Sequence, residues 1–343
     1  MPSKLPQRIC ITPQARSVGG PASFQRRFAA GLAARGIQAT FDLDDAPYDA
    51  VLVVGATRRL GKLRRVKKAG IPIVQRLNGI NWLHKKRKTG LRHYLKAEYG
   101  NFLLSYVRHH LANRIIYQSE FARDWWQRAF GAVAAPGTIA YNAVDLEVFS
   151  PSQAGRPPAD IYRLLLVEGR LGGGYEMGLE AAVAMAEELR RVHDLPVELV
   201  IAGKVDAQVI SDWEGRTGIP LTWAGLLPSA EIPALDGSAH LLYSADLNAA
   251  CPNSVIEALA CGLPVVAFAT GALPELVKDG AGEVVPYGGD PWALDRPDIP
   301  ALAAAAARIL HSQTAYRQAA RARAEAAFGL DAMLDAYLAA LSS

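Results

Sequence analysis

The pattern best suited to binding a phosphate group lies in residues 251–276. Pro252-Asn253-Ser254 has the composition of a loop and helix cap, and an apolar helix is expected to begin near Val255. The free backbone N–H groups at the start of a helix suit a diphosphate. Glu257, within the first turn or so, has a carboxylate that can accept ribose hydroxyls beside that phosphate. An equally open alternative is that Glu257 only complements the helix dipole.

Lysine and arginine are concentrated between Asp49 and Glu98, where fourteen of them occur without one acidic residue. The rest of the chain has the opposite balance, with 23 basic against 33 acidic residues. In residues 58–70 and 82–96 the cations alternate with Leu, Trp and Tyr. This composition suits an anionic membrane surface, a phosphate-bearing lipid acceptor or a polyanionic glycan. Nucleic acid is a weaker candidate, because no recognised binding motif accompanies the basic run.

Two smaller groups of polar residues could also do chemistry. Arg76, Asn78 and His84 follow an expected strand end within the basic region, and we expect them on the side of the site that binds an acceptor. His84 is a candidate base, although a histidine among lysines is more often simply exposed. Asp42-Leu-Asp-Asp offers an Asp-x-Asp pair that could hold a metal, but we interpret it as a solvated turn and expect no metal site.

Short apolar strands alternate with amphipathic helices along the chain, a pattern typical of parallel sheets. Phe24, Phe28 and Leu32 share one face of a helix that follows the first strand and the Gly19-Gly20 turn. The aperiodic, Pro- and Ser-rich residues 150–160 indicate a linker, after which the alternation restarts. Two Rossmann-like domains facing each other across a cleft are therefore expected. The expected strands are 8–12, 50–56, 72–78, 114–119, 137–143, 164–169, 197–203, 221–227, 240–246 and 264–271.

Composition excludes several other classes of protein. A chain of 343 residues, half hydrophobic and one fifth charged, is expected to be soluble and large enough for two domains. It lacks an apolar run of the ~20 residues that a membrane-spanning helix needs, and its N-terminus lacks the apolar stretch of a signal peptide. Three cysteines without CxxC spacing make a disulfide framework or zinc site improbable and favour a cytoplasmic location.

Residues 251–276 resemble the signature of glycosyltransferase family 4, whose members are retaining enzymes of GT-B fold. Five further segments agree in order and spacing, so the resemblance covers nearly the whole chain. They are the glycine-rich loop and helix at 18–36, YQSEFARDWW at 117–126, YNAVDLEVFSP at 141–151, and EGR at 168–170 followed by IAGK at 201–204. The resemblance implies an α/β GT-B protein with an acceptor-side domain at 1–150, a donor domain at 151–329 and a C-terminal helix, 330–343, crossing back to the first domain.

The resemblance also implies roles for individual residues. Glu257 would hold the ribose of a nucleotide-sugar, and the backbone N–H groups of Asn253, Ser254 and Val255 would hold the distal phosphate and the sugar. Gly19 and Gly20 would let the backbone approach the diphosphate, since a side chain there would obstruct it; the alternative is an ordinary tight turn. Leu226, within residues 223–227, would lie near the base.

Two departures from the family's pattern affect the expected site. The first Glu of the family's Glu-x(7)-Glu is replaced by Ala249, which leaves Asp246 or Asn248 as substitutes. The lysine expected about five residues after Arg170 is absent. Gly173 and Gly174 could cradle phosphate through their N–H groups instead, and Lys204 could supply the missing charge on the departing diphosphate. The alternatives are a flexible loop and a surface lysine.

Together these features predict a metal-independent hexosyltransferase without a cofactor, using a UDP- or GDP-linked sugar and a lipid-linked or polysaccharide acceptor. The basic region at 58–96 would place it at the inner face of a membrane as a peripheral, cytoplasmic protein. One alternative is a degenerate protein that binds nucleotide or glycan without catalysis. Another is a GT-B nucleotide-sugar epimerase or hydrolase. A dehydrogenase is disfavoured, because no G-x-G-x-x-G follows the first strand of either domain.

Overall fold

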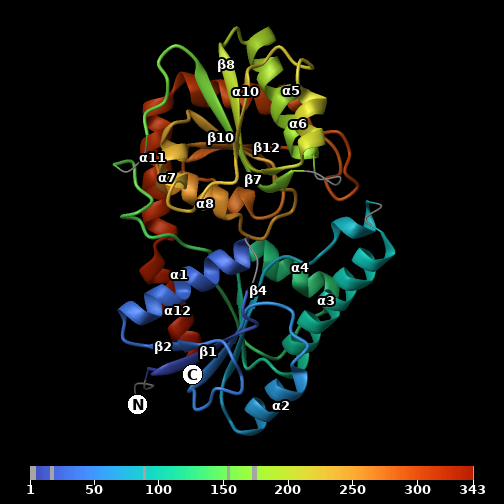
Figure 1. Ribbon diagram of the computed structural model, residues 1–343, viewed down its shortest axis with the longest axis vertical. Helices are drawn as coiled ribbons and strands as arrows, with labels where there is room; N and C mark the ends of the chain where they lie inside the picture. Colours follow the sequence, from blue (N-terminus) through green and yellow to red (C-terminus); the bar gives the residue numbers. More distant parts are fainter. Residues whose placement is uncertain (1–4, 16–18, 88–89, 153–154, 172–175, 343) are drawn as a thin grey trace. The chain divides into compact units, whose positions relative to one another are not determined.

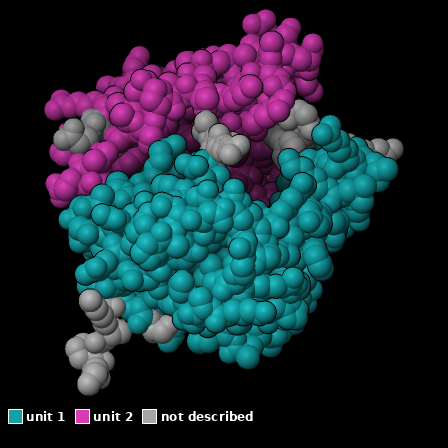
Figure 2. Space-filling model, turned by 60° about the horizontal axis from the view of Figure 1, so that its bottom comes forward, with its two compact units in different colours: residues 1–142, 330–343 teal, residues 143–329 magenta. Residues whose placement is uncertain are grey.

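The chain forms two compact units, coloured separately in Figure 2. The computed structural model describes residues 5–15, 19–87, 90–152, 155–171 and 176–342. Unit 1 comprises residues 1–142 and 330–343, and unit 2 comprises residues 143–329. The C-terminal helix thus belongs to unit 1. The division falls at 142/143 instead of the expected 150/151, so the Pro- and Ser-rich segment lies inside unit 2.

Unit 1 is built on a parallel six-stranded sheet in the order β2-β1-β3-β4-β5-β6. The central strands β1, β3, β4 and β5 are almost wholly buried, because helices cover a parallel sheet on both faces. The six strands are β1 (Arg8–Thr12), β2 (Gln38–Thr40), β3 (Ala50–Val53), β4 (Ile73–Leu77), β5 (Arg114–Tyr117) and β6 (Gly137–Ile139).

The first helix of unit 1 packs on the last helix of the chain, which lies beside it in Figure 1. As the spacing predicted, Phe24, Phe28 and Leu32 are buried, and the centroid of each phenylalanine ring lies 5.2 Å from that of the Tyr337 ring. The helices of unit 1 are α1 (Gly20–Ala34), α2 (Leu60–Lys68), η1 (Leu83–Lys85, a 3-10 turn), α3 (Leu91–His110), α4 (Glu120–Phe130) and α12 (Leu330–Leu341).

Unit 2 repeats the architecture with a second parallel sheet, in the order β12-β11-β10-β7-β8-β9. All five expected strands are present, and β12 is an addition that the sequence analysis missed. The strands are β7 (Tyr162–Leu171), β8 (Val197–Val205), β9 (Leu221–Gly225), β10 (Leu241–Ser244), β11 (Val265–Phe268) and β12 (Gly282–Val285).

One large apolar core in unit 2 joins the sheet to α5 and α10. The alanine-rich α10 packs closely on α5, because small side chains let two helices approach each other. The helices of unit 2 are α5 (Met177–Val192), α6 (Ala207–Trp213), α7 (Ile232–Gly237), α8 (Asn253–Ala260), α9 (Leu273–Leu276), α10 (Ile299–His311) and α11 (Gln313–Ala327). None of the helices in the described residues is long and apolar enough to cross a bilayer.

Candidate active site

The strand order of unit 2 marks one edge of its sheet as a ligand site. From β7 the chain proceeds to β8 and β9 on one side, then returns to β10 and proceeds to β11 and β12 on the other. Open α/β sheets bind ligands outside the carboxyl ends of the two strands where the order reverses. Here those strands are β7 and β10, which are direct neighbours in the sheet. The helix that follows β10 is α8, the helix singled out by the sequence.

Helix α8 begins at Asn253, two residues earlier than expected. Its N-cap is Pro252, whose side chain has no acceptor for the first N–H groups of the helix. Asn253, Ser254 and Val255 therefore form the first turn, where N–H groups and the helix dipole favour an anion. Glu257 is the fifth helical residue and is half-buried. Burial raises the pKa of Asp236 well above its ordinary value, and the charge of Glu257 raises it further.

Arg170 and Lys204 are paired in register on the neighbouring strands β7 and β8. The strand expected at 197–203 would leave Lys204 just beyond its end; β8 continues to Val205, so Lys204 lies within it. Arg170 has an exposed side chain, and its Nη2 atom lies 2.9 Å from Oδ2 and 3.2 Å from Oδ1 of Asp206. The structure thus brings the two expected cations together at the end of β7. Gly173 and Gly174 lie outside the described residues.

A pair of acidic side chains, Glu168 and Asp246, lies at the same edge of the sheet. Glu168 is in β7, and Asp246 follows the end of β10 by two residues. Burial raises the pKa of Asp246 from 3.8 to about 6. Burial also raises the pKa of Glu168 well above 4.5, and the charge of Asp246 raises it further. Glu168 was not among the predicted site residues, although a carboxylate in the otherwise apolar LLLVEG strand is a signal that could have identified it.

The residue before Ala249 differs from its neighbours in conformation and burial. Asn248 has φ 55°, a left-handed backbone that asparagine tolerates better than most residues. Its side chain is 4% exposed, and its Nδ2 atom has no hydrogen-bond partner among the described residues. Asp246 and Asn248, the two residues considered as substitutes for the missing glutamate, both lie in the loop between β10 and α8. Asp246 contributes a carboxyl group and Asn248 a buried amide donor.

The three remaining donor-side predictions lie at the start of helix α1 and directly after strand β9. Gly19 is the N-cap of α1 with φ 140°, a conformation that requires glycine, and a Cβ there would meet open space. Gly20 is the first residue of α1. Leu226 directly follows β9 and is 56% exposed. These positions are compatible with ligand contact, but their roles stay predictions.

Arg76 was expected after a strand end and instead lies inside β4, with 1% exposure. The strand is central in its sheet, so all five of its residues are buried. The Nη2 atom of Arg76 donates to Asn142 Oδ1 at 2.8 Å, and its guanidinium lies 4.1 Å from the Phe24 ring centroid. Arg76 therefore has a structural role, linking β4 to Asn142 and to Phe24 of α1 in the interior of unit 1.

His84 is also buried, contrary to the expectation of an exposed histidine. Its Nε2 atom lies 2.7 Å from Glu98 Oε1, and its ring packs edge-on against Tyr94. A ring held in this way by a carboxylate fits a structural role better than that of a free base. Asn78 follows β4 as expected, and its carbonyl oxygen accepts a hydrogen bond from Trp126 Nε1 at 2.6 Å.

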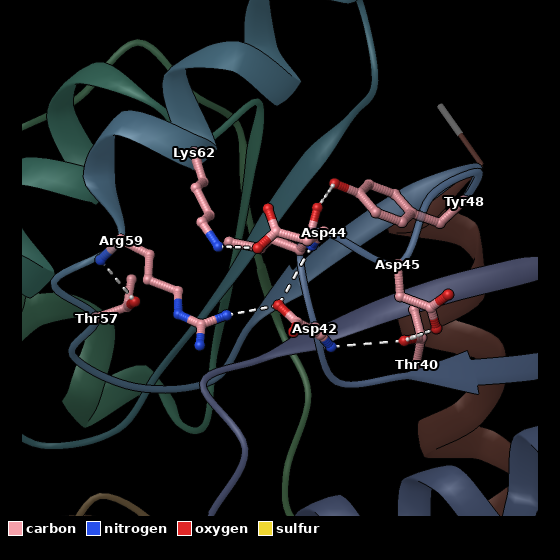
Figure 3. A network of polar contacts seen from close by, with 9 residues as sticks. Thr40, Asp42, Asp44, Asp45, Tyr48, Thr57, Arg59 and Lys62 are labelled. Atoms are coloured by element: carbon pink, nitrogen blue, oxygen red, sulfur yellow. Dashed lines mark hydrogen bonds and ion pairs between the residues drawn. The ribbon is translucent and has the colours of Figure 1, made fainter.

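Basic side chains pair with the acidic turn after β2, and Figure 3 shows two of them, Arg59 and Lys62. Asp42 pairs with Arg59 at 2.6 Å, Asp44 with Lys62, and Asp45 with Arg8 at 2.5 Å. The pKa of Asp42 is lowered, first by the Asp44 N–H and then by Arg59. Among the described residues, no group of three or more His, Cys, Asp or Glu side chains is arranged to hold a metal.

Known proteins match part of the sequence and nearly all of the fold. Residues 163–312 match the family model described as Glycosyl transferases group 1. A stretch of 178 residues is 26% identical to the 2-deoxystreptamine glucosyltransferase of Streptomyces kanamyceticus, covering 47% of this chain and 44% of that protein. The chain thus matches less than half of the length of that curated relative.

Solved structures resemble nearly the whole chain. Sucrose-phosphate synthase from Thermosynechococcus elongatus has a TM-score of 0.73 at 17% identity, covering 96% of this chain and 97% of its own. Anabaena Alr3699/HepE in complex with UDP-glucose has a TM-score of 0.67 at 17% identity, covering 98% and 99%. The chain thus has the GT-B fold, and residues 163–312 of its second unit match the group 1 glycosyltransferase model.

Proposed function

We propose that this protein transfers a hexosyl group from a nucleotide-diphospho-sugar, UDP- or GDP-linked, with retention of configuration and without a metal. The observation that carries the proposal lies in unit 2. There, the N-terminus of α8 and the cations Arg170 and Lys204 occur at the carboxyl edge of a sheet that matches the group 1 family. Breaking a sugar–diphosphate bond builds negative charge on phosphate, and this edge concentrates groups that stabilise it.

Each donor-site residue has a distinct proposed role. The N–H groups of Asn253, Ser254 and Val255 bind the distal phosphate, and Glu257 accepts the ribose hydroxyls. Arg170 and Lys204 neutralise the departing diphosphate. Arg170 is held by Asp206, an exposed ion pair that contributes little stability, so a diphosphate can compete for the guanidinium.

The carboxyl group missing at Ala249 is replaced, in this proposal, by Asp246. It lies on the loop that leads to α8, and it pairs electrostatically with Glu168 at the sheet edge. A carboxyl group with a pKa of about 6 is partly protonated near neutral pH, so it can donate as well as accept a hydrogen bond. Such a group suits sugar hydroxyls, which both donate and accept.

For the acceptor we propose a lipid-linked or polysaccharide glycan, bound by unit 1 at the cytoplasmic face of a membrane. The Anabaena structure is named as a complex with UDP-glucose, which supports a UDP-sugar as the first donor to try. The acceptor assignment rests on the basic composition of residues 50–97.

A second candidate is a protein that binds a nucleotide-sugar without turnover. Ala249 in place of a glutamate and the engagement of Arg170 by Asp206 favour it. Transfer or hydrolysis of radiolabelled UDP- and GDP-sugars, assayed with membrane extracts as acceptor, separates the two functions. Under the proposal, Arg170→Gln lowers kcat/KM by about 10²-fold, the usual cost of removing a group that stabilises developing charge.

The matched control is Arg308→Gln, which removes another exposed arginine of unit 2. Arg308 pairs with Glu283 at 3.1 Å and is 56% exposed, against 60% for Arg170. It should leave turnover unchanged. If the wild type binds the donor without turnover, the transferase proposal is wrong and the second candidate, a nucleotide-sugar-binding protein, is correct. Sugar release that ignores acceptor would identify a hydrolase.

A further inference from the structure

Helix α3 exposes an unusual number of large apolar side chains. Among the described residues, five of the nine exposed large hydrophobic side chains lie on this one helix, which runs along the outer edge of unit 1 in Figure 1. Their exposed fractions range from 40% to 74%. They are Leu91, Tyr94, Leu95, Tyr99 and Phe102.

Four of these residues form a continuous stripe. Leu91, Leu95, Tyr99 and Phe102 are spaced by four, four and three residues, so they follow one face of the helix. The residues that α3 buries in unit 1 lie on the opposite face, at 100° per residue. They are Ala97, Asn101, Leu103, Leu104, Val107 and Arg108. The helix therefore has one apolar face in the core and a second one in solvent.

Cations surround the exposed stripe. The guanidinium of Arg58 lies 5.5 Å from the Tyr99 ring centroid, and that of Arg64 lies 5.3 Å from the Tyr106 ring centroid. Arg92 and Lys96 are exposed on α3 itself. The one acidic residue of α3, Glu98, forms an ion pair with Lys85 at 3.1 Å, and its Oε1 atom lies 2.7 Å from His84 Nε2.

We propose that this face of unit 1 docks on an anionic lipid bilayer, with α3 lying in the interface and Leu91, Leu95 and Phe102 entering its apolar part. The surrounding arginines and lysines would contact the lipid phosphates. A surface on which exposed aromatic and leucine side chains are bordered by cations has the composition of a membrane-interface contact. The inference gives the proposed membrane setting a specific surface, but its test needs neither donor nor acceptor.

A soluble polyanion is the weaker occupant for a physical reason. A polyanion gains from the cations but gains nothing from Leu91, Leu95 and Phe102, whose exposure to water would remain unexplained. A bilayer gains from both, because the apolar side chains leave water while the cations stay at the phosphates. Substitution of the apolar stripe alone should therefore weaken binding of a bilayer but not binding of a soluble polyanion.

The first experiment is sedimentation of the full chain with phosphatidylcholine vesicles that contain either no phosphatidylglycerol or about 30 mol% of it. The wild type should bind the anionic vesicles and release them at high salt. Leu95→Gln with Phe102→Gln should weaken that binding at least about tenfold, because two buried apolar side chains are lost. Lys96→Gln alone should weaken it about fivefold. Val192→Gln is the control, since Val192 is an exposed residue of unit 2 with 53% exposure.

A second measurement protects against a folding defect. The three native cysteines are buried, so a cysteine introduced by Phe102→Cys can be labelled selectively with an environment-sensitive fluorophore. Emission should shift to the blue with anionic vesicles and stay unchanged for the same label after Val192→Cys.

Three outcomes would overturn the proposal. One is equal binding of neutral and anionic vesicles, and another is no blue shift at position 102. The third is vesicle binding that survives Leu95→Gln with Phe102→Gln, particularly if heparin competes fully, which would indicate a polyanion site. Because no sugar donor is present, failure here would leave the proposed transferase activity standing, and loss of transfer would leave docking untouched.

Discussion

Asp246→Asn should stabilise the protein above pH 6 while impairing its function. Asp246 has its pKa raised from 3.8 to about 6 by burial, so the folded state binds its proton more strongly than the unfolded state. Between pH 3.8 and about 6 the Asp246 carboxyl group is ionised in the unfolded chain but protonated in the folded chain. The free energy of unfolding therefore falls as pH rises through this range and levels off above about pH 6. At 1.36 kcal/mol per pKa unit, the ionised carboxylate costs about 3 kcal/mol.

That value is an upper limit, because the Asp246 side chain is half-buried and water screens part of the cost. A gain of 1 kcal/mol raises the melting temperature of a unit of this size by about 2–4 °C. Thermal melts of wild type and variant from pH 4 to pH 8 should therefore converge near pH 4. They should separate by several degrees above pH 6, with the variant higher. Glu168 should ionise more easily in the variant, adding to the gain.

The difference between the two curves isolates this site from the other carboxylates of the chain. Asp212→Asn, which changes an exposed aspartate of α6, should shift the melt by less than about 1 °C at any pH. A variant that is equally or less stable than wild type at pH 7.5 would refute the raised pKa of Asp246. A stabilised variant with full transferase activity would refute its place in the sugar site.

Two further predictions concern unit 1. Gly31→Val should lower the free energy of unfolding by about 1–3 kcal/mol in thermal melts, because a Cβ at Gly31 would lie 2.4 Å from Leu334 on α12. Gly61→Ala is the control and should be neutral or stabilising, because a Cβ there meets nothing within 4 Å. Unchanged stability of Gly31→Val would mean that α12 does not pack on α1 at this position. Ser119→Ala should cost about 1 kcal/mol in urea unfolding, since Ser119 Oγ accepts from the Ala122 N–H at 3.0 Å and caps α4; an unchanged midpoint would contradict the cap.

The sequence predicted the parts of the fold that follow from periodicity and local chemistry. The bounds of α4, Glu120–Phe130, follow from local chemistry of this kind, since Ser119 caps its start and Gly131, with φ 78°, ends it. Strand ends were less accurate: the strand predicted at 137–143 ends at Ile139. Apolar residues beyond that point pack in loops, which sequence periodicity does not distinguish from strands.

The site was only partly predictable for a physical reason. Arg170 and Lys204 carry a recognisable chemistry, but their pairing depends on the register of β7 and β8, which no local pattern encodes. The burial of Arg76 and His84 depends on partners far away in sequence, Asn142 and Glu98. A polar residue in a basic segment is exposed unless tertiary contacts bury it, and those contacts lie outside any sequence window.

The most direct test of the central claim is calorimetric titration of the wild type with UDP-glucose, a GDP-sugar and an ADP-sugar. The account predicts saturable binding of one nucleotide class. Binding should weaken at least about tenfold in Glu257→Gln and Arg170→Gln, the usual cost of losing a hydrogen bond to a charged group, and stay unchanged in Arg308→Gln. Binding of none of the three, or binding that is indifferent to Glu257 and Arg170, would contradict a nucleotide-sugar site at the carboxyl edge of the unit 2 sheet.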